Sequence, residues 1–271
     1  MRPVEPKPAA SVVLVEPGTG EPLEVYLIRR GHGMRFLGGF YAFPGGKVDD
    51  ADASPEALAR CRFVGPGPSD TVARAWDGLP PAAFCVTAIR ELFEETGVLM
   101  ACDTAGRPID PADRSTAASI AGWRSAILED GADLTSLLAN AGWFYHVAPL
   151  RYLAHFITPA SSPIRFTARF FLAPLPSGQR PRLFLEETSE GFWIGPRLAY
   201  RRFQAGKLPM AEPAEYTLAY LAQFDGCDAL WRAHADGQPK LHGIVDRIEF
   251  YGEGYDWTTG TWRFNKPFWH P

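Results

Sequence analysis

Apolar residues recur along the chain with two different periods, and these periods predict its secondary structure. Alternating or continuous apolar runs predict strands at 11–15, 24–28, 147–158, 165–173 and 192–194. Helical spacing predicts helices at 82–98, 111–128, 132–139, 196–205 and 213–224. A further helix begins after Ser54, because Ser54 is a favourable N-cap and Pro55 suits the first helical position. Strands and helices are interleaved throughout, which predicts a mixed α/β layer fold.

The helix predicted at 82–98 carries carboxylates on one face, and Gly97 is a typical C-cap residue. Glu91, Glu94 and Glu95 fall within an arc of about 100°. The opposite side is apolar and holds Cys85, Ile89, Leu92 and Phe93. Like charges at this spacing destabilise a helix by about 0.2–0.5 kcal/mol per pair, and a hard divalent cation with oxygen ligands would neutralise them. An exposed acidic helix face is the alternative.

Composition narrows the function classes further. The net charge of -4 and the pI near 5.9 argue against nonspecific nucleic-acid binding, which requires a basic surface. An anionic substrate would therefore need a metal ion or local arginines. The four cysteines form no CxxC pair, so we expect reduced thiols in a cytoplasmic protein. Residues 1–10 lack an apolar signal region and 11–15 is too short to cross a bilayer, so neither export nor membrane insertion is expected.

The segment upstream of the glutamates resembles the first half of a known motif. The double glycine in Phe43-Pro-Gly-Gly-Lys47 allows the backbone to turn sharply beside a metal ion or phosphate. Together with 90–98 it resembles the signature of the Nudix family, G-x5-E-x7-R-E-U-x-E-E-x-G-U, where U is apolar. Gly46 supplies the first glycine, Asp52 stands in place of the first glutamate, and 90–98 match the remainder.

The match departs from the signature in two places. Aspartate replaces glutamate at 52, and 37 residues separate Asp52 from Arg90 where the signature has seven. The surplus, within 54–81, resembles the insertion of a long-insert Nudix branch that includes peroxisomal coenzyme A diphosphatases. Residues 25–30, 40–46, 165–174 and 186–194 are also similar to strands and loops of that branch.

This resemblance implies a fold and a domain plan. We expect an α/β/α sandwich with a mixed sheet, the carboxylate helix on one side and additional helices. We expect one Nudix hydrolase domain over 1–271, with an insertion at about 53–82 and a helical elaboration at about 101–142. A homodimer is also expected, because dimers are common in the family.

The resemblance also assigns roles to the site residues. Metal ligands would be Glu91, Glu94 and Glu95, with the Gly46 carbonyl as an extra one, and the ion would be Mg²⁺ or Mn²⁺. Arg90 would orient Glu91. The base that activates water differs between branches, so a helix glutamate (Glu94 or Glu95) and a loop carboxylate (Glu187 or Glu190) both stay open.

Several residues around the motif are candidates for substrate contacts, each with a plainer alternative. The basic set that would bind phosphates, together with Gly45, comprises Arg29, Arg30, Arg35 and Lys47. Surface solvation explains each of these charges equally well. Asp52 could instead cap the helix near Ser54. Phe192 and Trp193 could stack on a base or belong to the core.

In this family water attacks a phosphorus of a diphosphate linkage, so the resemblance implies a small nucleotide-like substrate. We expect coenzyme A or acyl-coenzyme A, cut to 3′,5′-ADP and (acyl-)phosphopantetheine, with the aromatic segment 250–269 compatible with the thioester arm. A diphosphatase for ADP-ribose, NADH or another nucleoside diphosphate derivative is the alternative. A catalytically silent Nudix ligand-binding module is the rival from another class, although the three helix glutamates are retained.

Overall fold

A mixed sheet forms the centre of the protein in a computed structural model that describes residues 4–31, 38–63, 77–158, 160, 162–183, 188–244, 247–250, 255–256 and 261–262. Its strand order within these residues is β10-β2-β1-β9-β8-β11-β12, with β3 on β2 and β4 on β1. The strands are β1 (Lys7–Glu16), β2 (Glu24–Arg30), β3 (Tyr41–Ala42), β4 (Gly45–Lys47), β8 (Arg151–Ile157), β9 (Phe166–Pro174), β10 (Thr188–Ile194), β11 (Leu241–Ile244) and β12 (Arg247–Phe250). The pairs β1–β9 and β8–β11 are parallel.

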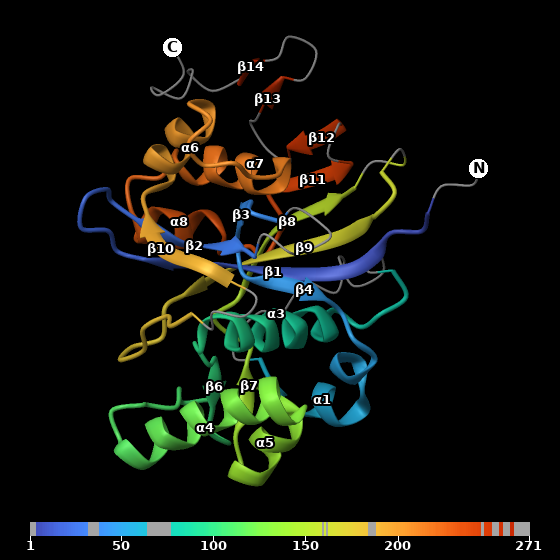
Figure 1. Cartoon of the computed structure of the whole chain (residues 1–271), viewed down its shortest axis with the longest axis vertical. Coiled ribbons are helices and arrows are strands. Elements are labelled where there is room, and N and C mark those ends of the chain that lie inside the picture. Colours follow the sequence, from blue (N-terminus) through green and yellow to red (C-terminus); the bar gives the residue numbers. More distant parts are fainter. Residues whose placement is uncertain are drawn as a thin grey trace.

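Helices cover both faces of this sheet (Figure 1). One face carries η1 (Asp50–Ala53), α1 (Pro55–Ala59), α3 (Pro81–Thr96), α4 (Arg114–Asp130), α5 (Leu134–Ala141) and a small sheet of β5 (Cys61–Arg62), β6 (Ala101–Cys102) and β7 (Phe144–His146). The other face carries α6 (Pro196–Gln204), α7 (Glu212–Leu221) and α8 (Cys227–Ala233). A two-stranded sheet joins β13 (Tyr255–Asp256) to β14 (Thr261–Trp262). The predicted α/β/α sandwich with a mixed sheet is confirmed.

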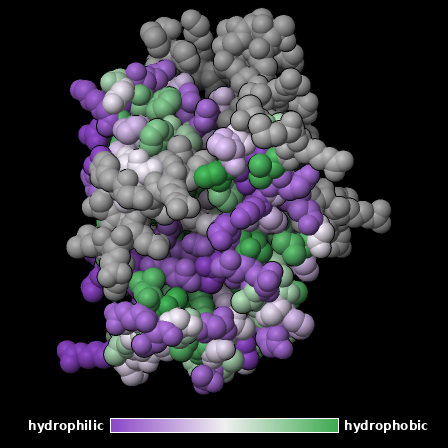
Figure 2. All heavy atoms as spheres, turned by 45° about the vertical axis from the view of Figure 1, so that its right-hand side comes forward, coloured by the Kyte–Doolittle hydropathy of each residue, from purple (hydrophilic) through white to green (hydrophobic). Residues whose placement is uncertain are grey.

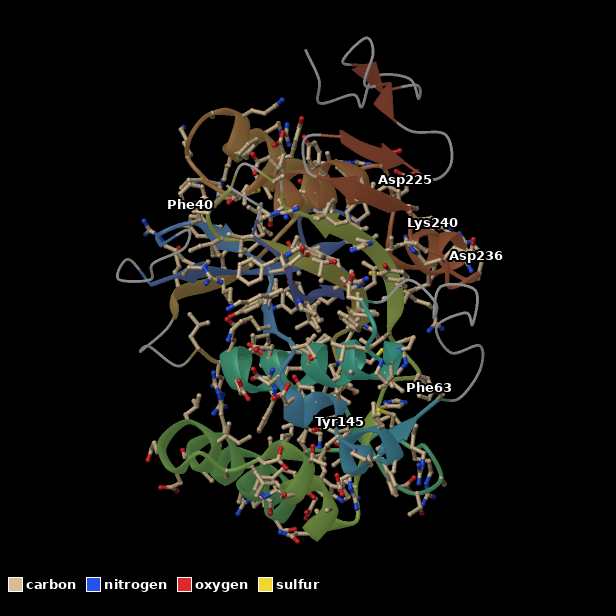
Figure 3. The ribbon with its side chains drawn as sticks, turned by 90° about the vertical axis from the view of Figure 1, so that its right-hand side faces the viewer. Phe40, Phe63, Tyr145, Asp225, Asp236 and Lys240 are labelled. Carbon is tan, nitrogen blue, oxygen red and sulfur yellow. The ribbon has the colours of Figure 1, made fainter. Side chains whose placement is uncertain are left out.

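Alternation along β1 divides the interior into two cores. Ala10, Val12 and Leu14 are fully buried in the core beneath α3, whereas Val13 and Val15 belong to the core beneath α7. This is the expected result for a strand whose successive side chains point to opposite faces. The α3-side core continues to the small sheet, where Tyr145 lies below α3 with its hydroxyl 2.9 Å from Thr135 of α5 (Figure 3). β1 is therefore the common wall of both cores.

One face of the molecule shows how polar and apolar side chains are distributed over the described residues. The face drawn in Figure 2 is mostly hydrophilic outside the grey residues, broken by small apolar groups. Among the residues that the structure describes, no helix combines the length and the apolar character needed to cross a bilayer.

Most predicted elements are present with shifted ends. The first two strands form an antiparallel pair, and Ser54 caps α1 by accepting the amide of Ala57 at 3.2 Å. The strand predicted at 147–158 is wrong at its start, because 147–150 turn between β7 and β8. Pro149, which lacks an amide hydrogen, lies in this turn. The helix α8 and the strands β11 and β12 were not predicted.

A buried charge lies between the sheet and α3. The side chain of Arg169 on β9 is buried, and its guanidinium lies 4.6 Å from the centre of the Phe84 ring on α3. It forms an ion pair with Asp77 and donates to the Thr167 hydroxyl at 2.9 Å. His155 contacts the same hydroxyl at 2.8 Å. A guanidinium in this position requires a paired carboxylate, because an isolated buried charge is strongly destabilising.

Asp77→Asn should lower the free energy of unfolding by about 1–3 kcal/mol, because it removes the charge paired with Arg169 while the partial exposure of Asp77 moderates the loss. Urea unfolding followed by tryptophan fluorescence measures the change. The double variant Asp77→Asn/Arg169→Met should recover part of it. An Asp77→Asn protein as stable as the wild type would show that the pair does not stabilise the fold.

Candidate active site

The helix α3 positions the three glutamates through strong local signals. It begins with Pro81 at its first turn and ends at Gly97, whose φ of 71° suits glycine and whose amide donates to the Phe93 carbonyl at 2.7 Å. Its apolar side, including Phe84 and Leu92, is fully buried in the core shared with β1. The acidic face therefore has a fixed orientation.

Arg90 is the centre of the hydrogen-bond network on this face. Its Nε and Nη2 donate to the two carboxylate oxygens of Asp52, each at 2.9 Å. Its Nη1 donates to Glu91 Oε1 at 2.9 Å and to Glu94 Oε2 at 3.1 Å. Nη2 also donates to the Lys47 carbonyl at 3.0 Å. Burial alone would lower the pKa of Arg90, but the bonds to Asp52 and the charges of Glu91 and Glu94 outweigh it and raise that pKa. The predicted contact of Arg90 with Glu91 is present.

Asp52 supports this network from the 3₁₀ turn η1. It is 2% exposed and accepts hydrogen bonds from the Thr87 hydroxyl at 2.8 Å and the Asp49 amide at 3.0 Å as well as from Arg90. Its carboxylate therefore closes a capping box on η1 with Asp49 while it holds Arg90. The cap of α1 is Ser54 instead. The shorter side chain of aspartate reaches Arg90 with both oxygens.

The strand β4 runs directly against the carboxylates. The amide of Gly45 donates to Glu95 Oε2 at 2.8 Å. A Cβ atom at Gly46 would overlap the Glu91 carboxylate, and one at Gly45 would lie 2.6 Å from Ser11 Cα. The two glycines therefore permit a close approach of backbone to carboxylate that a larger residue would prevent.

Negative charge is concentrated and partly desolvated at this point. Burial raises the pKa of Glu91 to about 7; Arg90 opposes this rise, and the neighbouring Glu94 adds to it. Burial likewise raises the pKa of Glu94 against the opposing effect of Arg90. A single guanidinium thus compensates the acidic face only in part.

The donor set has the chemistry of a hard-cation site, although its present arrangement is not a closed one. Within the described ranges no three acidic, histidine or cysteine side chains converge closely enough to hold a metal ion. Arg90 binds one oxygen each of Glu91 and Glu94, and the Gly45 amide binds Glu95. Three carboxylates beside backbone carbonyls of β4 are nevertheless the ligands that Mg²⁺ and Mn²⁺ prefer. These residues fit such an ion chemically.

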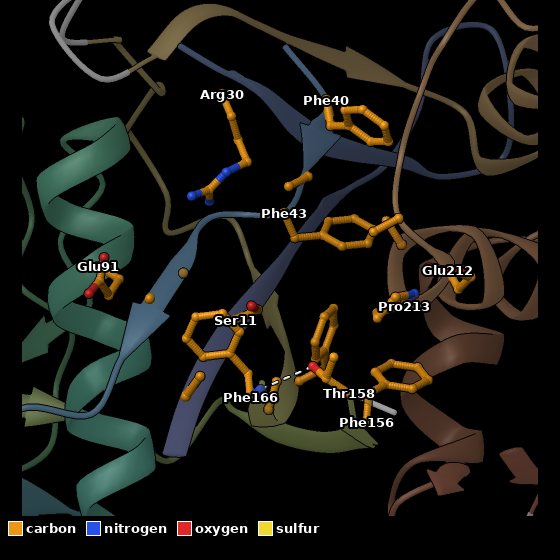
Figure 4. Close-up of a pocket in the computed structure, with 18 of the residues that line it drawn as sticks. Ser11, Arg30, Phe40, Phe43, Glu91, Phe156, Thr158, Phe166, Glu212 and Pro213 are labelled. Atoms are coloured by element: carbon orange, nitrogen blue, oxygen red, sulfur yellow. Dashed lines mark hydrogen bonds between the residues drawn. The ribbon is translucent and has the colours of Figure 1, made fainter. Parts of the chain in front are cut away.

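A cavity of about 620 Å³ opens beside the acidic face, a size typical of ligand sites. Figure 4 shows Glu91 of α3 at one side of it and Phe156 and Pro213 at the other. Its lining comprises Ala9, Ser11, Arg30, Phe40, Tyr41, Ala42, Phe43, Gly45, Gly46, Lys47, Glu91, Glu95, Phe156, Thr158, Ser162, Phe166, Ala168, Phe170, Ala211, Glu212, Pro213 and Ala214. Six of the predicted site residues therefore line one cavity: Arg30, Gly45, Gly46, Lys47, Glu91 and Glu95.

Arg29 and Arg30 point to opposite faces of β2. Arg30 lines the cavity, and no described residue accepts a hydrogen bond from its buried Nε. Arg29 lies 3.8 Å from Glu190 and 5.5 Å from the centre of the Tyr41 ring, outside the cavity lining. Of these two arginines, Arg30 is thus the one that lines the cavity.

The remaining sequence candidates lie elsewhere. Glu190 accepts the Tyr41 hydroxyl at 2.8 Å, so it approaches the cavity only through Tyr41. Trp193 packs on Tyr26 and Phe192 on Tyr41. Arg35 and Glu187 lie outside the described residues, as do the side chains of the C-terminal aromatic segment.

Sequence patterns missed the aromatic wall of the cavity. Phe156, Phe166 and Phe170 come from β8 and β9, and the far side comes from the start of α7. Each phenylalanine is also what an ordinary buried strand would contain. A signal was present only in the small residue Ala168 between two phenylalanines on one face of β9.

A sheet between helical layers, with a glutamate helix packed against a double-glycine strand, is the arrangement of a Nudix hydrolase. The model of the NUDT19 Nudix domain family matches residues 7–221. The chain belongs to this family, and the prediction of a Nudix hydrolase is confirmed.

Relatives support this assignment over most of the chain. The acyl-coenzyme A diphosphatase NUDT19 of Gallus gallus is 29% identical, with 84% of this chain and 71% of that protein aligned. The Homo sapiens protein of the same name is 26% identical, with 80% of this chain and 65% of that protein aligned. The crystal structure of a NUDIX hydrolase from Alicyclobacillus acidocaldarius is similar with a TM-score of 0.69 and 32% identity, covering 85% of this chain and 96% of that one.

Gly46→Ala should mainly lower the hydrolase activity, whereas Gly45→Ala should mainly lower the stability of the fold. In Gly46→Ala the new methyl overlaps the Glu91 carboxylate, which must then move from its position on Arg90, so we expect at least a tenfold loss of hydrolase activity and a smaller loss of unfolding free energy than in Gly45→Ala. In Gly45→Ala it meets backbone atoms of β1, so stability should fall by about 1–3 kcal/mol. Urea unfolding and turnover measure both effects. Equal destabilisation of the two variants would contradict this distinction.

Proposed function

We propose that this Nudix hydrolase cuts the diphosphate linkage of coenzyme A or acyl-coenzyme A in a metal-dependent reaction, releasing 3′,5′-ADP and (acyl-)phosphopantetheine. The observation that supports it most is the acidic face of α3, which meets the glycine strand β4 at the polar end of a cavity large enough for such a substrate. The chicken and human relatives named as acyl-coenzyme A diphosphatases support the choice of substrate.

The proposed ligands of Mg²⁺ or Mn²⁺ are Glu91, Glu94 and Glu95, with the Gly46 carbonyl beside them. When bound, the ion would neutralise charge that develops on the phosphate oxygens. Arg90 is a positioning residue, because it holds Glu91 and Glu94 while Asp52 holds Arg90. The chain thus fixes its carboxylates before the substrate arrives.

We infer that a helix glutamate activates the attacking water. Glu95 lines the cavity, whereas Glu190 is separated from it by Tyr41 and is paired with Arg29. Glu190 remains the second candidate, because its carboxylate accepts a hydrogen bond from the hydroxyl of Tyr41, and Tyr41 lines the cavity.

The polar end of the cavity suits the phosphates of this substrate. Arg30 and Lys47 bring two positive charges to the cavity lining beside the acidic face. A guanidinium forms strong charge-assisted bonds with phosphate oxygens. We therefore assign Arg30 and Lys47 to the substrate phosphates, in preference to Arg29.

Purified enzyme with Mg²⁺ or Mn²⁺ should release 3′,5′-ADP from coenzyme A and acyl-coenzyme A, and a chelator should abolish the release. Glu94→Gln and Glu95→Gln should each lose at least about 10²-fold in kcat, because each removes a charge from the proposed ion site. Mass spectrometry identifies the products, and Glu190→Gln beside these variants tests the second candidate base.

The exposed variant Glu129→Gln on α4 controls for a general loss of negative charge. A panel containing ADP-ribose, NADH and nucleoside triphosphates distinguishes the alternatives. AMP from ADP-ribose or NADH without turnover of coenzyme A would overturn the substrate. Absence of metal-dependent turnover across the panel would indicate a ligand-binding module instead.

Arg30→Gln should raise KM for the preferred substrate by about 10- to 100-fold with a smaller effect on kcat, because a charge-assisted bond contributes about 1.5–3 kcal/mol. Arg29→Gln should have a weaker effect, since Arg29 is paired with Glu190. The exposed Arg107→Gln on the far helical side serves as the control. A larger effect at Arg29 than at Arg30 would reverse the assignment.

A further inference from the structure

The cavity has two chemically different ends. Its polar end contains Arg30, Lys47, Glu91 and Glu95, next to β4. Its other end lies between β8, β9 and the start of α7 and is largely apolar, apart from the exposed carboxylate of Glu212 at its α7 edge. The side chains there are Phe43, Phe156, Phe166, Phe170, Ala9, Ala168 and Ala214. In Figure 4 Phe43 and Phe166 lie between Glu91 and the α7 side of the cavity.

Small residues on two adjacent strands form the floor of the apolar end. The parallel pairing of β1 with β9 places Ala9 beside Ala168 and Ser11 beside Phe170. Phe166, Ala168 and Phe170 share one face of β9, because alternate residues of a strand point the same way. Two alanines side by side thus leave a hollow that a larger residue at either position would fill.

The walls of this hollow are rigid. Phe170 packs edge-on against Phe156 with ring centres 5.0 Å apart and against Phe43 at 6.2 Å. All three rings belong to the buried core beneath α7 and are at most 7% exposed. Aromatic rings held in this way form a preformed surface, which lowers the entropic cost of binding an apolar group.

Hydrogen-bonding groups are scarce at this end. The Thr158 hydroxyl accepts the Phe166 amide at 3.0 Å, and the Ser162 hydroxyl donates to the Ile164 carbonyl at 2.7 Å. The other lining hydroxyls belong to Ser11 and to Tyr41, and that of Tyr41 donates to Glu190. Polar groups of a ligand that are buried here without partners would be costly. The chemistry of this end therefore favours the methyl and methylene groups of a ligand.

We infer that the apolar end binds the non-nucleotide arm of the substrate, with the methyl and methylene groups of the arm against the aromatic wall, and that the nucleotide half stays at the Arg30 and Lys47 end. This inference rests on the proposed function, in which that arm is the phosphopantetheine half of coenzyme A. It makes Ala9 and Ala168 specificity-determining residues. Burial of each methylene group of the arm in the hollow lowers the Kd by about fourfold.

The two hydrolysis products report separately on the two ends. Titration calorimetry of phosphopantetheine and of 3′,5′-ADP should be carried out on the wild type, Ala168→Val, Ala168→Leu and the exposed control Ala118→Leu on α4. Ala168→Leu fills the hollow and should raise the Kd of phosphopantetheine at least about tenfold, with Ala168→Val intermediate. The Kd of 3′,5′-ADP should stay within twofold in every variant.

Thermal unfolding of each variant shows that the fold is retained, and the smaller Ala168→Val substitution serves where leucine is not accommodated. An unchanged Kd for phosphopantetheine in folded variants, or a raised Kd for 3′,5′-ADP instead, would overturn the inference. Turnover of coenzyme A by the wild type is measured independently. Turnover with unaltered phosphopantetheine binding in the variants would leave the proposed function standing and remove only the placement of the arm.

Discussion

The bidentate pairing of Arg90 with Asp52 is the contact on which the rest of the site depends. Asp52 belongs to the turn that follows the glycine strand, and Arg90 belongs to the helix after a long intervening segment. The guanidinium joins these two pieces and, with its remaining donors, holds Glu91 and Glu94. Because the charges are mutually dependent and largely buried, loss of either partner would disturb the strand, the helix and both glutamates together.

The glycine strand explains how an acidic helix on one side of the sheet serves a cavity formed largely on the other. Gly45 and Gly46 lie between α3 and the aromatic wall, and both present only backbone to their neighbours. Glu91 and Glu95 can therefore line the cavity across β4. The same strand thus supports the carboxylates through its backbone. Because it lacks side chains at Gly45 and Gly46, it also leaves Glu91 and Glu95 accessible from the cavity.

Local signals made the helix and its glutamates predictable from sequence. Proline at the start of α3, glycine at its end and an apolar face of matching period all agree, so no distant contact was needed to identify them. The choice between Arg29 and Arg30 was not predictable in this way, since it depends on which face of β2 meets the cavity. The aromatic wall is non-local as well: it requires the pairing of β1 with β9 and the position of α7, neither of which has a sequence signature.

The parallel pairing of β1 with β9 also has a consequence for the order of folding. These strands pair from Lys7 to Val15, and just before β1 the Arg165 side chain donates to the carbonyl of Val4 across 161 positions of the chain. Contacts between such distant segments form slowly, because closing the intervening loop is entropically unfavourable. During synthesis the acidic helix is complete long before β9 and α7 emerge from the ribosome. The nascent chain therefore contains the carboxylates of α3 before the cavity wall formed by β9 and α7 exists. The part of the site that would select the substrate is the last to form.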